Sequence, residues 1–193
     1  MSLKISEIAK TIGGYTFRKS IESDKSGNVF VLQANNINNG KNIENTDDFI
    51  KTSFQGFRTA TFLQKNDIVL VSRGTGFGSF RSVVFLSGDS NVIASSSLFI
   101  VRLLNKNILP DYLTLYLNSS EGQNKLLKIA SGSHFQAIPR KEFDNIDIPI
   151  PTLEKQKLMI DLNDNIKKQQ DLVSRKYKIM ENIINQSFTS LNN

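Results

Sequence analysis

The sequence predicts an α+β protein, with one mixed α/β globular domain over residues 1–151 and a long coiled-coil helix over residues 152–193. Short apolar runs separated by stretches with Gly and Asn indicate strands in the first part. A proline followed by helical spacing indicates at least one helix beside them. Neither Gly nor Pro occurs after Pro151, so the C-terminal part is free to form one uninterrupted helix.

The first segment is expected to form a short amphipathic helix. Apolar residues recur there at helical spacing, namely Leu3, Ile5, Ile8 and Ile12. The Gly13-Gly14 pair ends this pattern, and a strand is expected over Val29–Leu32.

An Asn-rich loop follows, in which Asn39-Gly40 marks a turn. Its asparagines include Asn35, Asn36, Asn38 and Asn39. We interpret them first as loop residues, because Asn accepts left-handed backbone geometry. The alternative is a recognition role, since an Asn amide can bond to two groups of adenine.

Two apolar runs, Ile68–Val71 and Val83–Leu86, flank a glycine-rich loop and predict a strand-loop-strand unit. The loop glycines are Gly74, Gly76 and Gly78. A further strand is expected over Ser97–Leu103. Pro110 marks the start of a helical segment, with apolar spacing at Leu113, Leu117 and Leu126.

The domain is expected to end in an extended segment, because isoleucines alternate with prolines up to Pro151. Thr152 is an N-cap candidate for the helix that follows. Apolar residues recur along that helix at Met159, Leu162, Ile166, Val173, Tyr177, Met180, Ile184, Phe188 and Leu191. About 38 helical residues would span roughly 57 Å, which is more than a domain of this size can cover. The helix therefore requires a helical partner.

Composition narrows the function classes. The formal charge of +6 and the pI near 9.5 favour an anionic partner such as nucleic acid. The absence of Cys excludes disulfides, zinc-thiolate sites and thiol nucleophiles. No stretch approaches the roughly 18 consecutive apolar residues of a membrane span, and no secretory signal opens the chain, so we expect a cytoplasmic protein without membrane contact.

No catalytic motif is evident. A methyltransferase would need an Asn- or Asp-Pro-Pro motif, and a magnesium nuclease would need Glu-x-Lys, neither of which occurs. His134 is the only histidine, so it is interpreted as a polar loop residue, and a DNA contact is preferred over catalysis. We expect no bound metal and no cofactor on this chain.

The glycine-rich loop is a candidate contact region. It lacks the Gly-Lys-Ser/Thr of a phosphate-binding loop, and a strand pattern rather than a helix follows it. It does place guanidinium and hydroxyl donors on a backbone that can approach a ligand closely. The alternative is a tight hairpin whose arginines are merely solvated.

Four segments carry a family resemblance. FLQKNDIVLVSRGTGFG resembles a strand of the target-recognition domains of type I restriction-modification specificity subunits. VIASSSLFIVRL and ILPDYLTLYLNSSEGQ are similar to a later strand and helix of that family, and SGSHFQAIPRKEFDNIDIPIPTLEKQ to its domain-closing motif. Thr152 replaces a family proline, and Asn66 replaces a turn glycine, a change that Asn tolerates.

The resemblance implies a sequence-specific DNA-binding protein that is not itself an enzyme. It implies one half of a specificity subunit, which forms a homodimer on double-stranded DNA and docks the methyltransferase subunit and, through it, the restriction subunit. S-adenosylmethionine, ATP and Mg²⁺ would belong to those partners. The expected DNA contacts are Arg73, Thr75, Ser79, Arg81, His134, Gln136 and Arg140. The expected dimer and partner face of the helix comprises Leu162, Ile166, Val173, Tyr177, Met180, Ile184 and Leu191.

Two alternatives remain open from the sequence. The chain could be the recognition part of a longer, fused restriction-methylation enzyme, in which the same domain reads DNA for catalytic segments in cis. It could also be an assembly protein whose long helix organises a complex while the basic globular part binds no DNA.

Overall fold

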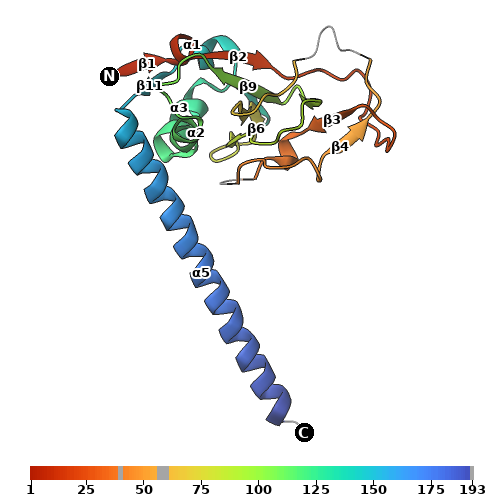
Figure 1. The fold of residues 1–193 in the computed structure, drawn as a ribbon, viewed down its shortest axis with the longest axis vertical. Coiled ribbons are helices and arrows are strands. Elements are labelled where there is room, and N and C mark those ends of the chain that lie inside the picture. Colours follow the sequence, from red (N-terminus) through yellow and green to blue (C-terminus); the bar gives the residue numbers. More distant parts are fainter. Residues whose placement is uncertain (39–40, 56–60, 192–193) are drawn as a thin grey trace. The chain divides into compact units, whose positions relative to one another are not determined.

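The computed structural model describes residues 1–38, 41–55 and 61–191 (Figure 1). It consists of two compact units, Met1–Leu153 and Glu154–Asn193. We call the first the globular unit. The turn predicted at Asn39-Gly40 lies outside the described residues.

A four-stranded antiparallel sheet forms the centre of the globular unit. In spatial order its strands are β2 (Ala9–Gly13), β9 (Leu98–Leu103), β5 (Ile68–Val71) and β7 (Ser82–Val84). β9 is apolar at successive positions because both of its faces are covered. Ile100 belongs to the main core, whereas the ring of Phe99 lies 5.8 Å from the ring of Phe143 on the opposite face.

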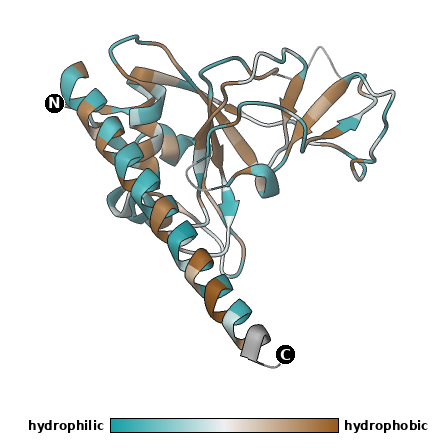
Figure 2. Ribbon diagram, turned by 60° about the horizontal axis from the view of Figure 1, so that its bottom comes forward, coloured by the Kyte–Doolittle hydropathy of each residue, from teal (hydrophilic) through white to brown (hydrophobic). Residues whose placement is uncertain are grey.

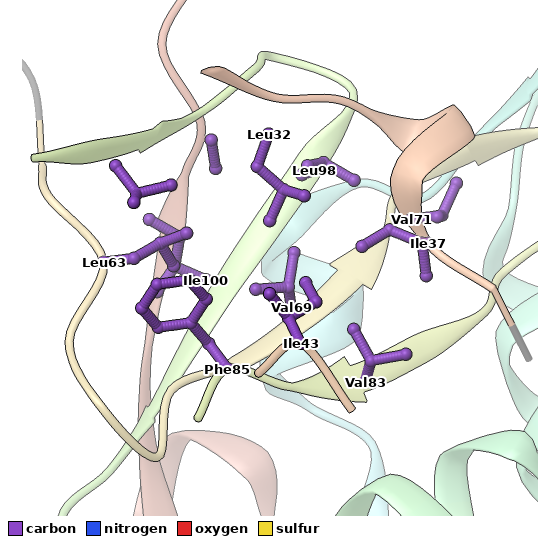
Figure 3. Close-up of a cluster of buried hydrophobic side chains, with 12 residues drawn as sticks. Leu32, Ile37, Ile43, Leu63, Val69, Val71, Val83, Phe85, Leu98 and Ile100 are labelled. Carbon is purple, nitrogen blue, oxygen red and sulfur yellow. The ribbon is translucent and has the colours of Figure 1, made fainter. Parts of the chain in front are cut away.

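A three-stranded sheet covers one face of the central sheet. It contains β4 (Ile50–Thr52), β3 (Val29–Leu32) and β8 (Val92–Ala94), with β3 antiparallel to β4 and parallel to β8. The side chains between the two sheets form the main core shown in Figure 3, which consists of Leu32, Ile37, Ile43, Leu63, Val69, Val71, Val83, Phe85, Val92, Ala94, Leu98 and Ile100. This packing confirms the strands predicted at β3 and β5.

Helices cover the other face of the central sheet. They are α2 (Pro110–Asn118), α3 (Ser120–Ile129) and α4 (Arg140–Asp144). The predicted helical segment starts at Pro110 as expected but is divided at Ser119, whose backbone is extended and whose hydroxyl accepts a hydrogen bond from the Gly122 amide. This N-cap starts α3 as a separate helix.

The amide side chain of Asn118 fastens α2 to β7. It accepts a hydrogen bond from the Ser82 backbone N–H at 2.9 Å and donates to the Ser82 carbonyl oxygen at 2.8 Å. Asn118→Ala leaves both groups of the strand unpaired, so we expect the free energy of unfolding to fall by about 2 kcal/mol. Urea unfolding followed by circular dichroism measures this loss. Asn105→Ala is the matched control, because Asn105 accepts a single backbone hydrogen bond, from Asn107 at 2.9 Å, in an exposed turn. Equal midpoints for the two variants would contradict the expectation.

The helix predicted over residues 3–12 is wrong except for one turn. β1 (Ser2–Lys4) precedes α1 (Ile5–Ile8), and β2 begins directly at Ala9. Pairing with β9 determines the conformation of β2, since Ala9 and Thr11 are buried while Lys10 between them is exposed. The alternation of buried and exposed residues in β2 is short, and the isoleucines at helical spacing gave the stronger sequence pattern.

The two ends of the globular unit are paired. β11 (Asp147–Pro149) lies antiparallel to β1, with Ser2 opposite Pro149 (Figure 1). The Tyr112 hydroxyl of α2 donates to the Pro149 carbonyl oxygen at 2.6 Å. The extended end predicted around Pro149 is therefore a strand that closes the unit.

The long helix predicted after Pro151 is confirmed as α5 (Leu153–Leu191), which has 39 residues. Figure 2 shows apolar and polar segments along its length. None of the helices in the described part of the chain has the length and hydrophobicity of a membrane span.

Candidate nucleic-acid interface

A short ladder brings two loops of the globular unit together. β6 (Arg73–Gly74) pairs antiparallel with β10 (Gln136–Ala137), so that Gln136 is opposite Gly74. The Ile138 amide extends the pairing by donating to the Ser72 carbonyl oxygen at 2.9 Å. Two of the predicted DNA contacts, Arg73 and Gln136, thus come from loops that are far apart in the sequence but adjacent in the fold.

The glycine-rich loop has a fixed shape. Gly76 and Gly78 have φ values of 144° and 79°, a backbone region that residues other than glycine rarely adopt. The Ser79 hydroxyl donates to the Gly76 carbonyl oxygen and accepts from the Gly76 amide, which closes the turn. The Ser79 hydroxyl therefore holds the loop, while Thr75 is exposed.

The second loop is closed by the backbone of its own ends. Ser131 and Ala137 exchange two hydrogen bonds, at 2.9 and 3.0 Å. Gly132 has a φ of 120°, and a Cβ there would collide with the Phe135 carbonyl oxygen. His134 is exposed within this loop, and its ring meets the Phe135 ring edge-on at 5.7 Å.

Arg81 lies deeper than the sequence suggested. Its side chain is half-buried, its Nη2 donates to the Ala34 carbonyl oxygen at 3.4 Å, and its Nε is buried without a hydrogen-bond partner. Ala34 belongs to the 3₁₀ helix η1 (Ala34–Asn36). Arg81 therefore connects the glycine-rich loop to the Asn-rich segment.

A groove of about 600 Å³ lies beside these loops. Its lining includes Lys19, Asn35 and the serines 95–97. The Ser72 hydroxyl donates to the Ser97 carbonyl oxygen at 2.9 Å, which places this serine turn next to the β6–β10 ladder. Hydroxyl, amide and ammonium groups thus share the lining of this groove with apolar side chains such as Phe17 and Ile21.

The Asn-rich segment lines a separate polar hollow of about 630 Å³ with Asn35, Asn36 and Asn38. Asn36 is occupied locally, because it accepts from the Gln33 amide and donates to the Asp48 carbonyl oxygen. Asn39 lies outside the described residues.

Arg140 does not join the paired loops. It is the first residue of α4, pairs with Asp144 at 3.9 Å, and lines a different groove with Lys10 and Thr11. Pro139 starts α4 immediately after the ladder and turns the chain toward β2. The contact of Arg140 with DNA stays a prediction.

The apolar face of α5 is wider than the predicted stripe. The predicted residues Leu162, Ile166, Val173, Tyr177, Met180 and Ile184 are all exposed, as are Leu158, Leu172, Ile179 and Ile183. Each of the latter four directly precedes an apolar residue and so lies about 100° around the helix from it. The side chain of Leu191 lies outside the described residues.

A family model for the type I restriction modification DNA specificity domain matches residues 1–182. The chain belongs to this family. The StySPI specificity subunit of Salmonella potsdam is 28% identical over 173 residues, which are 86% of this chain and 36% of that subunit. The EcoKI specificity subunit of Escherichia coli K12 is 26% identical over 93% of this chain and 39% of that subunit. The specificity-domain chain therefore spans under two-fifths of the length of these relatives.

Solved structures share the fold. The HsdS subunit from Thermoanaerobacter tengcongensis has a TM-score of 0.64 and 18% identity, over 91% of this chain and 39% of that one. The S subunit of the type I restriction-modification system from M. genitalium has a TM-score of 0.57 and 17% identity, over 90% of this chain and 41% of that one. The predicted α+β class with a long helix is confirmed for this specificity-domain chain.

Sequence reasoning overlooked three parts of this interface. The serine turn at 95–97 adjoins the β6–β10 ladder, and Lys19 lines a groove with that turn, only because the chain folds back on itself. Phe77 and Phe135 are exposed within the loops, whereas a phenylalanine in an apolar sequence normally indicates core. The sequence did carry one signal for Phe77, because a glycine on each side of it indicates a loop rather than a core position.

The described residues 1–38, 41–55 and 61–191 contain no group of three or more His, Asp or Glu side chains arranged to hold a metal ion.

The charged groups with shifted pKa values lie away from the loops. The pKa of Arg102 is raised, because its hydrogen bonds with Asp67 outweigh the opposing effect of partial burial. These charges stabilise the fold rather than the interface.

Proposed function

We propose that this chain is a sequence-specific DNA-binding half-subunit of a type I restriction-modification system. It acts in the cytoplasm, does not catalyse a reaction itself, and directs separate methylation and cleavage subunits to a bipartite site. The match of the specificity-domain model over residues 1–182 carries this proposal. S-adenosylmethionine, ATP and Mg²⁺ are bound by the partner subunits.

The globular unit supplies the DNA contacts in this proposal. Arg73 attracts phosphates, and His134, Thr75, Gln136 and the serine turn offer hydrogen-bonding groups to the DNA from the two paired loops and the groove beside them. The Gln136 side chain is half-buried, and its Oε1 is buried without a hydrogen-bond partner. Such an acceptor can gain a partner when a ligand binds.

The helix α5 supplies the protein contacts. Two copies pair through the face that includes Ile166 and Val173, and the neighbouring apolar row that includes Leu172 and Ile179 packs against the methyltransferase subunit. The width of this face supports two neighbours, since a single helix-helix seam uses a narrower stripe. The homodimer makes the DNA target an interrupted inverted repeat.

A methylation assay tests the proposed function. The purified chain is mixed with the methyltransferase subunit from its own genomic neighbourhood, S-adenosylmethionine and unmodified genomic DNA, and methylated adenines are mapped by single-molecule sequencing. Methylation at an interrupted inverted repeat only when this chain is present is the expected result. An asymmetric bipartite site would require a different second recognition unit, and methylation independent of this chain would contradict the proposal.

Arg73→Ala is expected to weaken DNA binding several-fold for every sequence, because it removes a phosphate contact. The slope of log K against log salt should fall by about one. Fluorescence anisotropy at several salt concentrations measures both quantities. Lys106→Ala removes the same charge just beyond Leu103, at the end of β9 that is remote from the β6–β10 ladder, and should change neither quantity. Equal effects of the two variants would exclude a specific contact by Arg73.

A further inference from the structure

Two phenylalanines stand out on the surface of the globular unit. Phe77 is 61% exposed and Phe135 is 74% exposed. The other phenylalanines that the structure describes in this unit are buried or half-buried. A single exposed apolar side chain is ordinary, but these two share one structural feature. Each lies in a loop that leaves the β6–β10 ladder.

Both loops hold the backbone beside their phenylalanine in a defined conformation. Gly76 and Gly78 flank Phe77 with left-handed backbone, and the Ser79 hydroxyl closes that turn. Gly132 allows the second loop to pass close to the Phe135 carbonyl oxygen. Because the backbone around both rings is held, little backbone entropy would be lost when the rings bind a ligand.

The surroundings of the rings are polar and basic rather than apolar. Arg73 is exposed on the ladder itself, Thr75 is exposed two residues before Phe77, and Ser133 and His134 are exposed before Phe135. A protein partner is expected to meet a continuous apolar patch. Isolated aromatic rings among cationic and hydroxyl groups match DNA, which offers flat apolar base faces between phosphates.

We propose that Phe77 and Phe135 contact base faces of the recognition duplex, each inserting at a base step and unstacking it. This inference rests on the proposed function and assigns to the paired loops a part in deforming the DNA. Sequences with easily unstacked steps at these positions then bind better, so the rings add specificity without hydrogen bonds to base edges.

The test uses the complex of the full chain with its methyltransferase subunit and a duplex containing the mapped target. A 2-aminopurine is placed at one position at a time, except at the methylated adenine, which a methyltransferase itself extrudes. The wild-type complex should increase 2-aminopurine fluorescence at the unstacked steps. Phe77→Ala/Phe135→Ala should abolish that increase and weaken binding about 10-fold for each ring removed.

Two further variants make the result specific. Leu104→Ala removes an apolar side chain that is 67% exposed and follows β9 at the end remote from the β6–β10 ladder. It should leave both the 2-aminopurine fluorescence and the affinity for DNA unchanged. Phe77→Leu/Phe135→Leu keeps apolar side chains without aromatic stacking and should recover only part of the affinity. Because none of these variants removes a charge, the salt dependence of binding should stay as in the wild type.

The failures are distinguishable. If the wild-type complex does not bind its target, the proposed function itself is contradicted. If the wild-type complex binds and methylates but the double alanine variant matches it in affinity and fluorescence, only this inference is overturned. It is also overturned if the double alanine variant loses the methyltransferase subunit rather than the DNA, because the rings then belong to a protein interface.

Discussion

Asp67→Ala is expected to lower the free energy of unfolding by about 3 kcal/mol, and the melting temperature by roughly 10 °C. Asp67 is 2% exposed, and its two carboxylate oxygens accept hydrogen bonds from Arg102 at 2.8 and 2.7 Å. Removing the carboxylate leaves a guanidinium between β5 and β9 without its counter-ion. The Arg102 side chain is partly buried, at 27% exposure, so the loss of its partner costs more than an exposed surface pair is worth.

The same carboxylate also shapes the turn before β5. It accepts the Gln64 backbone N–H at 2.7 Å, and Asn66 between them has a φ of 73°. Arg102 extends the arrangement by donating to the Phe62 carbonyl oxygen at 3.1 Å. The substitution thus disturbs a turn, a strand and an ion pair together, which is why its expected effect is large.

Thermal unfolding followed by circular dichroism measures this effect. Asp171→Asn is the matched control, because Asp171 pairs with Arg175 on an exposed surface of α5, and its melting temperature should stay close to wild type. A double variant, Asp67→Ala/Arg102→Ala, should lose less stability than the sum of the two single variants. Strict additivity would show that the two side chains do not act as a pair.

Ile166→Asp/Val173→Asp is expected to weaken self-association by at least about 100-fold, because it places two carboxylates in an apolar helix-helix contact. Both side chains are about half-exposed in the single chain, at 46% and 51%. An isolated helix with so broad an apolar face gains most of its stability from packing. Sedimentation velocity over a range of protein concentrations measures the change.

Gln169→Asp/Gln170→Asp is the matched control for that variant. It adds the same two charges to the same turns of α5, but at exposed polar positions, and should leave association unchanged. If the Ile166→Asp/Val173→Asp protein still sediments as a dimer, α5 does not form the dimer contact. The homodimeric part of the proposed function would then be withdrawn, while DNA reading by the globular unit would remain.

Local patterns were sufficient where burial repeats along the chain. β5 and β9 are apolar at successive positions because sheets or helices cover both faces, and α5 shows helical spacing over many turns. β8 (Val92–Ala94) was not predicted, since three residues carry too little pattern. α1 was predicted too long because pairing between β2 and β9 overrides the spacing of the isoleucines.

The candidate site was only partly accessible to such reasoning. Arg73 and Thr75 could be chosen from the glycines around them, which signal close approach by the backbone. The pairing of their loop with Gln136 depends on contacts between distant segments. Ser79 and Arg81 were chosen for their chemistry, yet hydrogen bonds inside the fold engage both side chains. Sequence alone does not show which polar groups the protein uses for itself.

The pairing of β1 with β11 makes the globular unit a cassette. Its chain enters and leaves through two strands that are hydrogen-bonded to each other, with Leu3 opposite Ile148. Joining these ends by a short linker and opening the chain in an exposed loop should therefore give a circular permutant that still folds. By the same geometry, exchanging the segment between these two strands would replace the whole globular unit and leave α5 unchanged.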